Sequence, residues 1–418
     1  MINEILKSTW SLFLGMAILM LGNGLQGTLV SWRANYEGFS SSTTGWIMTA
    51  YYLGFLAGSF LTTKLVRRVG HVRVFAALAS LASAAMLIQI LLINPSAWFL
   101  MRLLTGFCFA GTYVIVEGWL NERSSNNTRG RILSLYMMVS YSGLAGGQWL
   151  LNVADPADFA LFLLASILLS FALVPVLITR THGPDLKENE SMNPRKLFRI
   201  APAGVASIML SSIAQGAMFG MGAVYASNAG MSVSQTALFM GVFIAFGAVS
   251  HWPMGYLSDR IDRRLVVVMA SFATVALSFL LFQQDKQSTL FIITFGLLGA
   301  MVLPIYSLGV AHTNDRLRTD QMSNASSTIV LLYGIGAAIG PISVGYIINI
   351  FGNSAYIIYL GGINLLTGLL VSYWIYQREA VPEDQQGEYQ LVPSRPTTVA
   401  MEAIALEAEE TMNFEEDE

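Results

Sequence analysis

The sequence predicts an all-α membrane protein with twelve transmembrane helices in two pseudo-symmetric six-helix halves. Three observations predict this fold: the apolar composition, a series of apolar segments, and two related charged loops that lie 192 residues apart. Of the 418 residues, 54% are hydrophobic and only 12% are charged. Because soluble domains carry roughly a quarter of charged residues, this composition excludes an ordinary soluble protein.

Each apolar segment has about the length of one membrane crossing, since a helix needs about 20 residues to span the hydrocarbon core. The eleventh segment is longer than one straight crossing requires, so we expect its membrane part to start near Ser326. The twelve predicted spans are 9–32, 43–66, 72–93, 97–121, 131–152, 157–179, 199–226, 233–257, 264–284, 288–312, 321–351 and 354–377.

Basic residues gather on one side of these spans. Up to residue 377 the chain has 21 basic residues, of which 18 lie at the N-terminus or in the even-numbered loops. Loops rich in Lys and Arg stay in the cytoplasm. We therefore expect a multi-pass protein of the cell inner membrane with both termini in the cytoplasm.

The same pattern divides the chain into four parts. Residues 9–180 are expected to form the N-terminal half, 181–198 a cytoplasmic linker, and 199–377 the C-terminal half. Residues 378–418 hold 12 of the 26 acidic residues and a Pro-Ser-Arg-Pro stretch. That composition predicts a disordered acidic cytoplasmic tail, with a possible short helix over residues 399–411.

The charged loop after the eighth span reads Gly255-x-x-x-Asp259-Arg260-x-Asp262-Arg263-Arg264, and its counterpart places Arg67 and Arg68 opposite Asp259 and Arg260. A carboxylate at this place can face the N-terminus of a helix from the other half, where free N–H groups favour negative charge. We expect a cytoplasmic gate that forms when the halves close, or a loop that only sets topology. The predicted gate residues are Gly255, Asp259, Arg260, Arg264, Arg68 and Arg131.

Small residues four apart recur in the fifth span of each half. Gly143 and Gly147 lie in the first half, and Gly336 and Gly340, followed by Pro341, lie in the second. Such pairs let two helices pack closely. Their spacing of 193 residues supports a duplicated construction, which is common in secondary transporters.

At these residues the chain resembles the major facilitator superfamily. The loop is similar to the signature Gly-x-x-x-Asp-Arg-x-Gly-Arg-Arg, with Asp262 in place of the second glycine, and Arg102-x-x-x-Gly106 is similar to the motif of the fourth span. The segments around Glu117, Arg131 and Pro253 resemble an uncharacterised bacterial branch, the YcaD type. The resemblance covers about residues 8 to 378 and implies secondary active transport by alternating access.

Two departures from that family pattern bear on mechanism. In the first half Arg67 stands where the family has aspartate, so we expect asymmetric gating. In the fifth span Gly146-Gly147-Gln148 lacks the glycine–proline pair of drug antiporters.

Two ionisable residues lie inside a predicted span, Arg102 and Glu117, and such residues are costly in a bilayer and suggest a functional site. Fifteen residues of helix separate them by roughly 22 Å, too far for an ion pair. Desolvation favours the protonated carboxyl, so Glu117 suits a proton carrier. It could instead form a structural pair with Arg129 or Arg131. Arg102 could bind an anion, hold a neighbouring backbone, or extend outward.

Uncharged polar residues in the spans that the family resemblance makes central are candidates for lining a solute cavity. These are Asn23, Gln26, Gln215 and Tyr306. The alternative is hydrogen bonding between helices, typically about 0.6 kcal/mol each.

No pattern for a nucleotide, a metal or a catalytic nucleophile is found, so we expect neither an enzyme nor a cofactor. The sequence favours a monomeric proton-coupled exporter or exchanger of a small organic solute, with no nucleic-acid partner. One alternative is a proton-independent or uptake transporter whose anionic solute binds Arg102. Another is a non-transporting scaffold or sensor that acts through its acidic tail.

Overall fold

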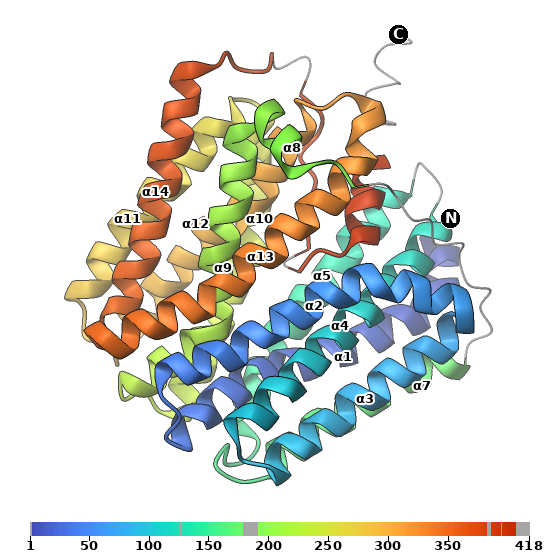
Figure 1. Ribbon diagram of the computed structural model, residues 1–418, viewed down its shortest axis with the longest axis vertical. Coiled ribbons are helices and arrows are strands. Elements are labelled where there is room, and N and C mark those ends of the chain that lie inside the picture. The colour runs from blue at the N-terminus through green and yellow to red at the C-terminus, as the bar shows by residue number, and fades with distance from the viewer. Residues whose placement is uncertain (1, 125–127, 179–190, 383–385, 394, 407–418) are drawn as a thin grey trace.

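The computed structural model describes residues 2–124, 128–178, 191–382, 386–393 and 395–406, with side chains described from residue 9 onward except at 319 and 320. The described chain is helical, with no strand in it. Figure 1 shows two bundles of long helices, blue to green and green to red, that lean against each other.

The first bundle contains five long helices and a sixth that is broken. They are α1 (Ile2–Tyr36), α2 (Ser41–Val69), α3 (His71–Leu91), α4 (Pro95–Glu122), α5 (Arg129–Trp149), and α6 (Ala160–Phe171) with α7 (Leu173–Ile178). Pro175 explains the break between α6 and α7, because proline lacks the N–H that continues a helix.

The second bundle repeats this order. Its helices are α9 (Pro202–Asn228), α10 (Val233–Ser258), α11 (Arg263–Gln283), α12 (Thr289–Asn314), α13 (Thr319–Phe351) and α14 (Ala355–Gln377), preceded by the short α8 (Pro194–Ile200). The described part of the predicted linker therefore contains a helix, and the rest of it lies outside the described residues.

The repeat extends to single residues of the turns. Gly38 and Gly230, 192 residues apart, end the first helix of each half with φ of 77° and 78°. Two residues later Ser40 and Ser232 cap the next helix, each accepting a hydrogen bond from the backbone N–H three residues on. Glycine tolerates a positive φ and serine is a preferred N-cap, so both turns follow from the same local sequence.

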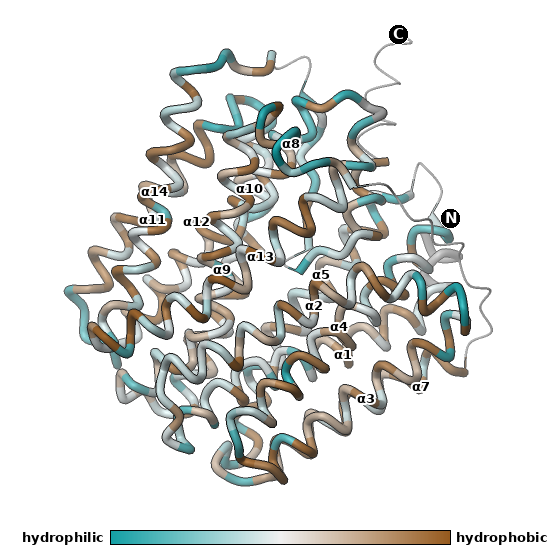
Figure 2. The backbone as a smooth tube through the Cα atoms, viewed as in Figure 1, coloured by the Kyte–Doolittle hydropathy of each residue, from teal (hydrophilic) through white to brown (hydrophobic). Residues whose placement is uncertain are grey.

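Ten of the helical segments in the described residues are long and apolar enough to cross a membrane. Helices α2 and α5 are long enough but more polar, and they complete the set of twelve. Figure 2 shows apolar residues along the helices and hydrophilic residues gathered at the loops.

Glycines bring helix backbones into contact within each half. A Cβ on Gly147 would overlap the Leu21 carbonyl of α1, and one on Gly340 would overlap the Ile213 carbonyl of α9. The two small-residue pairs thus lie at equivalent crossings, α1 with α5 and α9 with α13. In the same way Gly54 of α2 meets the backbone of α4 at Leu103.

The two halves touch at the end of the bundle remote from the termini. Thr49 of α2 donates to the Ala338 carbonyl of α13 at 2.7 Å, and Gly45 approaches the Pro341 carbonyl. Asn35 of α1 donates to Ser227 of α9 at 3.0 Å, and these residues are themselves 192 positions apart. At the opposite end the halves diverge, and the C-terminal segment lies between them (Figure 1).

The expectation of a disordered tail does not hold for its described part. Residues 386–393 and 395–406 lie between the halves, and residues 398–406 are helical. Val392, Thr397, Met401 and Ile404 are buried. The segment is ordered because its apolar side chains are removed from water there, which composition alone does not reveal.

We predict that Gly54→Ala lowers the stability of the purified protein by about 1–3 kcal/mol, because the added methyl group overlaps backbone that cannot move aside. A thermal-unfolding assay in detergent would measure the change. Gly362→Ala in α14 is the matched control, since nothing lies within 4 Å of its Cβ position. Equal effects of the two substitutions would contradict the backbone contact.

Candidate functional site

The centre of the bundle contains a polar cluster around Tyr51 of α2. The guanidinium carbon of Arg102, on α4, lies 4.5 Å from the centre of the Tyr51 ring, within the range of a cation–π contact. Asn23, on α1, donates to the hydroxyl of Tyr113, and Gln26 contacts Asn23 at 3.4 Å. Helices α1, α2 and α4 therefore contribute to one site.

Arg102 is buried, with 3% of its surface exposed. Its Nε and Nη1 atoms have no hydrogen-bond partner among the residues that the structure describes. The groups that act most strongly on its charge are tyrosines and another arginine, Arg395. A buried guanidinium with free donors is a site for an acceptor, since an unpaired buried charge is costly.

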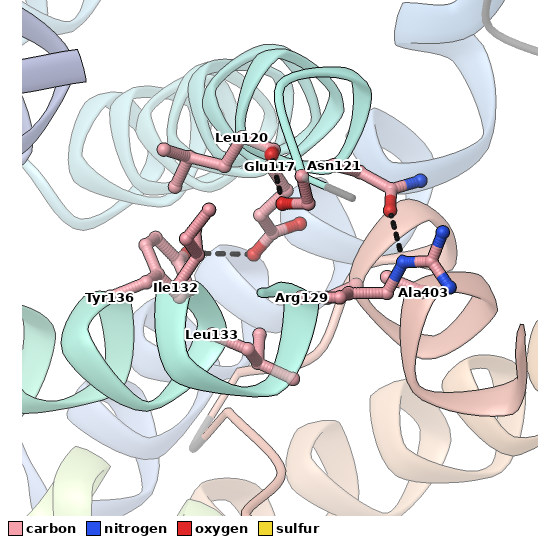
Figure 3. A pocket seen from close by; sticks show the side chains of 10 residues that line it. Glu117, Leu120, Asn121, Arg129, Ile132, Leu133, Tyr136 and Ala403 are labelled. Atoms are coloured by element: carbon pink, nitrogen blue, oxygen red, sulfur yellow. Dashed lines mark hydrogen bonds between the residues drawn. The ribbon is translucent and has the colours of Figure 1, made fainter. Parts of the chain in front are cut away.

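Glu117 follows Arg102 by fifteen residues on the same helix, α4, and only 5% of its surface is exposed. Its carboxylate accepts a hydrogen bond from Tyr136 of α5 at 2.6 Å (Figure 3). A second hydrogen bond comes from Thr397 of the C-terminal segment. Neither Arg129 nor any other described basic residue pairs with it, and Arg129 donates to Asn121 at 3.2 Å instead.

A small cavity of about 20 Å³ adjoins Glu117 and is lined by residues of α4, α5 and the C-terminal segment. A volume of this size is enough for one water molecule. Figure 3 shows the Glu117 carboxylate directed toward α5 between Tyr136 and the C-terminal segment. The carboxyl group therefore has hydroxyl partners and a small adjacent space, which suit gain and loss of a proton.

The other two cavity candidates lie in the second half. Gln215 of α9 is buried and contacts the Leu303 carbonyl at 3.4 Å within its own half. Tyr306 of α12 stacks edge-on against Tyr333 at 5.1 Å, and its hydroxyl lies 3.9 Å from the Met401 sulfur. The structure brings Asn23, Gln26 and Arg102 together, and it places Tyr306 against the C-terminal segment.

The C-terminal segment enters the polar cluster through Arg395. Its Nη1 atom donates to Asn23 at 2.9 Å and to the Tyr51 hydroxyl at 2.7 Å. Its guanidinium carbon lies 4.9 Å from the Tyr51 ring centre and 5.5 Å from that of Phe219. Two guanidinium groups, those of Arg102 and Arg395, thus contact one tyrosine ring.

The predicted gate residues are not joined across the two halves in this conformation. Asp259 pairs with Arg263 at 3.3 Å and accepts from the backbone N–H of Tyr389 at 2.9 Å. Arg264 pairs with Asp262 at 2.7 Å, and Arg260 covers the ring of Tyr256. Among the described residues, Asp259, Arg260 and Arg264 therefore make their contacts within the second half and with the C-terminal segment, and a gate between the halves stays a prediction.

The remaining gate positions lie around the same opening. Arg68 is exposed at the end of α2, and Arg131 of α5 lines a cleft of about 550 Å³ whose other wall is residues 388–391. Gly255 of α10 packs against the Tyr389 ring, where a Cβ would overlap it.

Two carboxylates at this end of the bundle hold the start of the C-terminal segment. Asp315 pairs with the buried Arg263 at 3.0 Å and accepts from the backbone N–H of Gly387. Burial raises the pKa of Asp315 to about 7, although the Arg263 charge opposes the rise. Burial also raises the pKa of Asp259. In contrast, although burial would raise the pKa of Asp262, the hydrogen bonds and charge of Arg264 hold it below its usual value.

Sequence reasoning missed several residues of the site. Tyr113, Phe219, Arg395 and Thr397 were not predicted. Tyr113 has no local signal, because only the packing of α1 against α4 reveals its partner Asn23. For Arg395 a signal existed: it is one of only two basic residues after residue 377.

The comparisons with known proteins agree with this architecture. The family model of the Major Facilitator Superfamily matches residues 12–286 and 205–404. The chain therefore belongs to this superfamily of membrane transporters, as the loop motif predicted. Transport, rather than catalysis, is the activity that this membership supports.

Curated relatives include the uncharacterized MFS-type transporter YcaD of Escherichia fergusonii, 26% identical over 360 residues, which cover 85% of this chain and 93% of the relative. A second is an uncharacterized MFS-type transporter of Enterobacter sp. (strain 638), 29% identical over 334 residues, or 79% and 86% of the two chains.

Solved structures share the fold at low identity. The nucleoside transporter NupG has a TM-score of 0.74 at 14% identity, with 88% of this chain and 98% of that chain covered. A bacterial homologue of the human lysosomal transporter Spinster, in an inward-facing and unoccupied conformation, has a TM-score of 0.68 at 14% identity, with 98% of both chains covered.

We predict that Asp259→Asn disfavours the state in which the halves are closed at the end that carries the chain termini, because in that state the carboxylate would face a helix N-terminus of the other half. Ser227 lies at the opposite end, which opens in that state, so the rate at which a maleimide labels Ser227→Cys reports how often the state is reached. The rate should fall about fivefold in Asp259→Asn and stay unchanged in the matched variant Arg67→Gln. Equal rates in both variants would mean that the loops only set topology.

Proposed function

We propose that the protein is a proton-coupled secondary transporter that exports or exchanges a small organic solute by alternating access. The observation that carries the proposal is Glu117, a buried carboxyl group beside a small cavity, with hydroxyl partners and no described basic partner. Ionisable groups placed in this way inside a membrane bundle are typical of proton relays.

The coupling follows from the cost of a buried charge. When Glu117 is protonated the group is neutral, and the halves can close around it with little desolvation cost. When the bundle opens to a compartment with few protons, the carboxyl group loses its proton, and the charged form favours the hydrated, open state. Proton flow would thus drive the exchange of states that moves the solute.

The orientation is part of the proposal. The basic loops lie at the end where the halves diverge, and the excess of Lys and Arg favours the cytoplasm for that end. The central cavity would then open inward, in the cell inner membrane, with both termini in the cytoplasm. In that orientation the contacts of Thr49 and Asn35 close the outer side.

A second candidate is proton-independent transport or uptake of a small anion. The free Nε and Nη1 donors of the buried Arg102 favour it, because a carboxylate or phosphate would complete them. Asn23 and the Tyr51 hydroxyl lie in the same cluster and could bind the rest of such a solute. Superfamily membership favours both candidates over a non-transporting scaffold or sensor.

The two candidates differ in their need for a proton gradient. A thermal-shift screen of organic anions, cations and neutral solutes on the purified protein selects the solute. In proteoliposomes, Glu117→Gln should abolish the stimulation of transport by an imposed pH gradient, because the amide cannot exchange a proton. Glu122→Gln, at the exposed end of the same helix, is the matched control. Unchanged gradient dependence in Glu117→Gln would refute the proton role.

For an anionic solute we expect Arg102→Gln to weaken binding about 10- to 100-fold, the loss typical of a charged hydrogen bond. Arg102→Lys should weaken it less, because the charge is kept while the planar fork is lost. Isothermal titration would measure both affinities. An affinity that is the same in the wild type and Arg102→Gln would exclude Arg102 as the anion site.

A further inference from the structure

The C-terminal segment, residues 386–393 and 395–406, lies between the two halves. Its apolar residues Val392, Met401 and Ile404 are 2% exposed or less, as buried as any core residue of the bundle. The helical residues 398–406 lie in the opening, against α13 and the first half (Figure 1). The segment is therefore packed as part of the fold rather than as a surface tail.

On the first half the segment uses the groups assigned to the solute and the proton. The Arg395 guanidinium donates hydrogen bonds to the side-chain oxygen of Asn23 and to the Tyr51 hydroxyl. Thr397 donates to the Glu117 carboxylate, and Thr398 donates to the Ser59 carbonyl of α2 at 3.1 Å. A solute that needs Asn23 or Tyr51 cannot bind them while Arg395 does.

The segment is also fixed to the second half. The Tyr389 N–H donates to Asp259, and the Val392 N–H donates to Ser307 of α12 at 3.3 Å. Ser326 of α13 donates to the Met401 carbonyl at 3.0 Å. One short stretch of chain thus connects both halves at the end where they must approach each other in the closed state.

We propose that the C-terminal segment, residues 386–393 and 395–406, is an autoinhibitory plug of the transport cavity, which must leave before the solute binds and the halves close. This proposal rests on the proposed function for the identity of the cavity. The plug blocks transport in two ways. It occupies the hydrogen-bonding groups of the site, and it fills the space that the two halves must close.

The plug is held in a way that permits release. Its apolar side chains favour insertion. Arg395, however, brings a second positive charge to the ring that Arg102 already contacts. The repulsion of two buried like charges opposes insertion. The bound and released states of the plug are consequently closer in free energy than its buried area alone implies.

The plug can be tested by the labelling of a cavity-wall cysteine, which requires neither solute nor proton. Ser326→Cys places a thiol under Met401, and the native Cys108, which is buried, reports unfolding. In the full chain the new thiol should react slowly with a water-soluble maleimide. Adding Arg395→Ala or Thr397→Val should accelerate labelling about tenfold or more, because hydrogen bonds to charged groups are lost.

Glu379→Gln is the matched control, since it changes an exposed charge that lies shortly before the C-terminal segment. It should leave the rate unchanged, and Cys108 should stay unlabelled in every variant. Equal and fast labelling of Ser326→Cys in the full chain and in both plug variants would overturn the plug. That result would not touch the proton role of Glu117, which its own gradient assay decides.

Inhibition is tested by locking the plug in place. A reducible thiol cross-linker should join Ser326→Cys to Met401→Cys within one chain. Transport of the solute from the thermal-shift screen should then stop, and it should return when the cross-link is reduced. The cross-linker should not change transport in a variant that carries only one of the two substitutions. Full transport in the cross-linked protein would show that the segment binds without inhibiting.

Discussion

The contact between α2 and α13 at one end of the bundle determines the rest of the molecule. Gly45 and Gly345 allow the two backbones to approach closely there, and the carbonyl oxygen of Pro341 lies against Gly45. Because this crossing is close, the helices diverge toward the other end, where residues 386–393 and 395–406 lie between the two halves. The polar cluster and the position of the C-terminal segment both follow from that divergence.

Two buried ionisable residues, Arg102 and Glu117, lie near this space. Arg102 and Glu117 are both on α4, yet each meets a different environment: an aromatic ring with free donors in one case, hydroxyl groups in the other. An apolar interior makes an unpaired charge costly. Under the proposed function, the partner that enters from outside is an anion for Arg102 or a proton for Glu117.

Much of the fold could be predicted from the sequence, because span length, charge placement and the 192-residue offset depend on local chemistry. The offset reaches as far as Gly38 and Gly230, whose turns have the same geometry. The break after Phe171 and the helix α8 were missed, since each depends on single residues in short segments. The largest difference concerns residues 386–393 and 395–406. Their composition predicts disorder apart from a short helix over residues 399–411, and composition cannot show that Arg395 and Thr397 find partners on the first half.

A plug on the same chain is a ligand at fixed effective concentration. A tethered segment of this length is present near its site at about millimolar levels, whatever the amount of protein. Every free solute competes with it, so the apparent dissociation constant equals the intrinsic one divided by the unplugged fraction. Affinity measured on the full chain would therefore understate the cavity, and a factor that captures the released segment would raise uptake or export without touching the site.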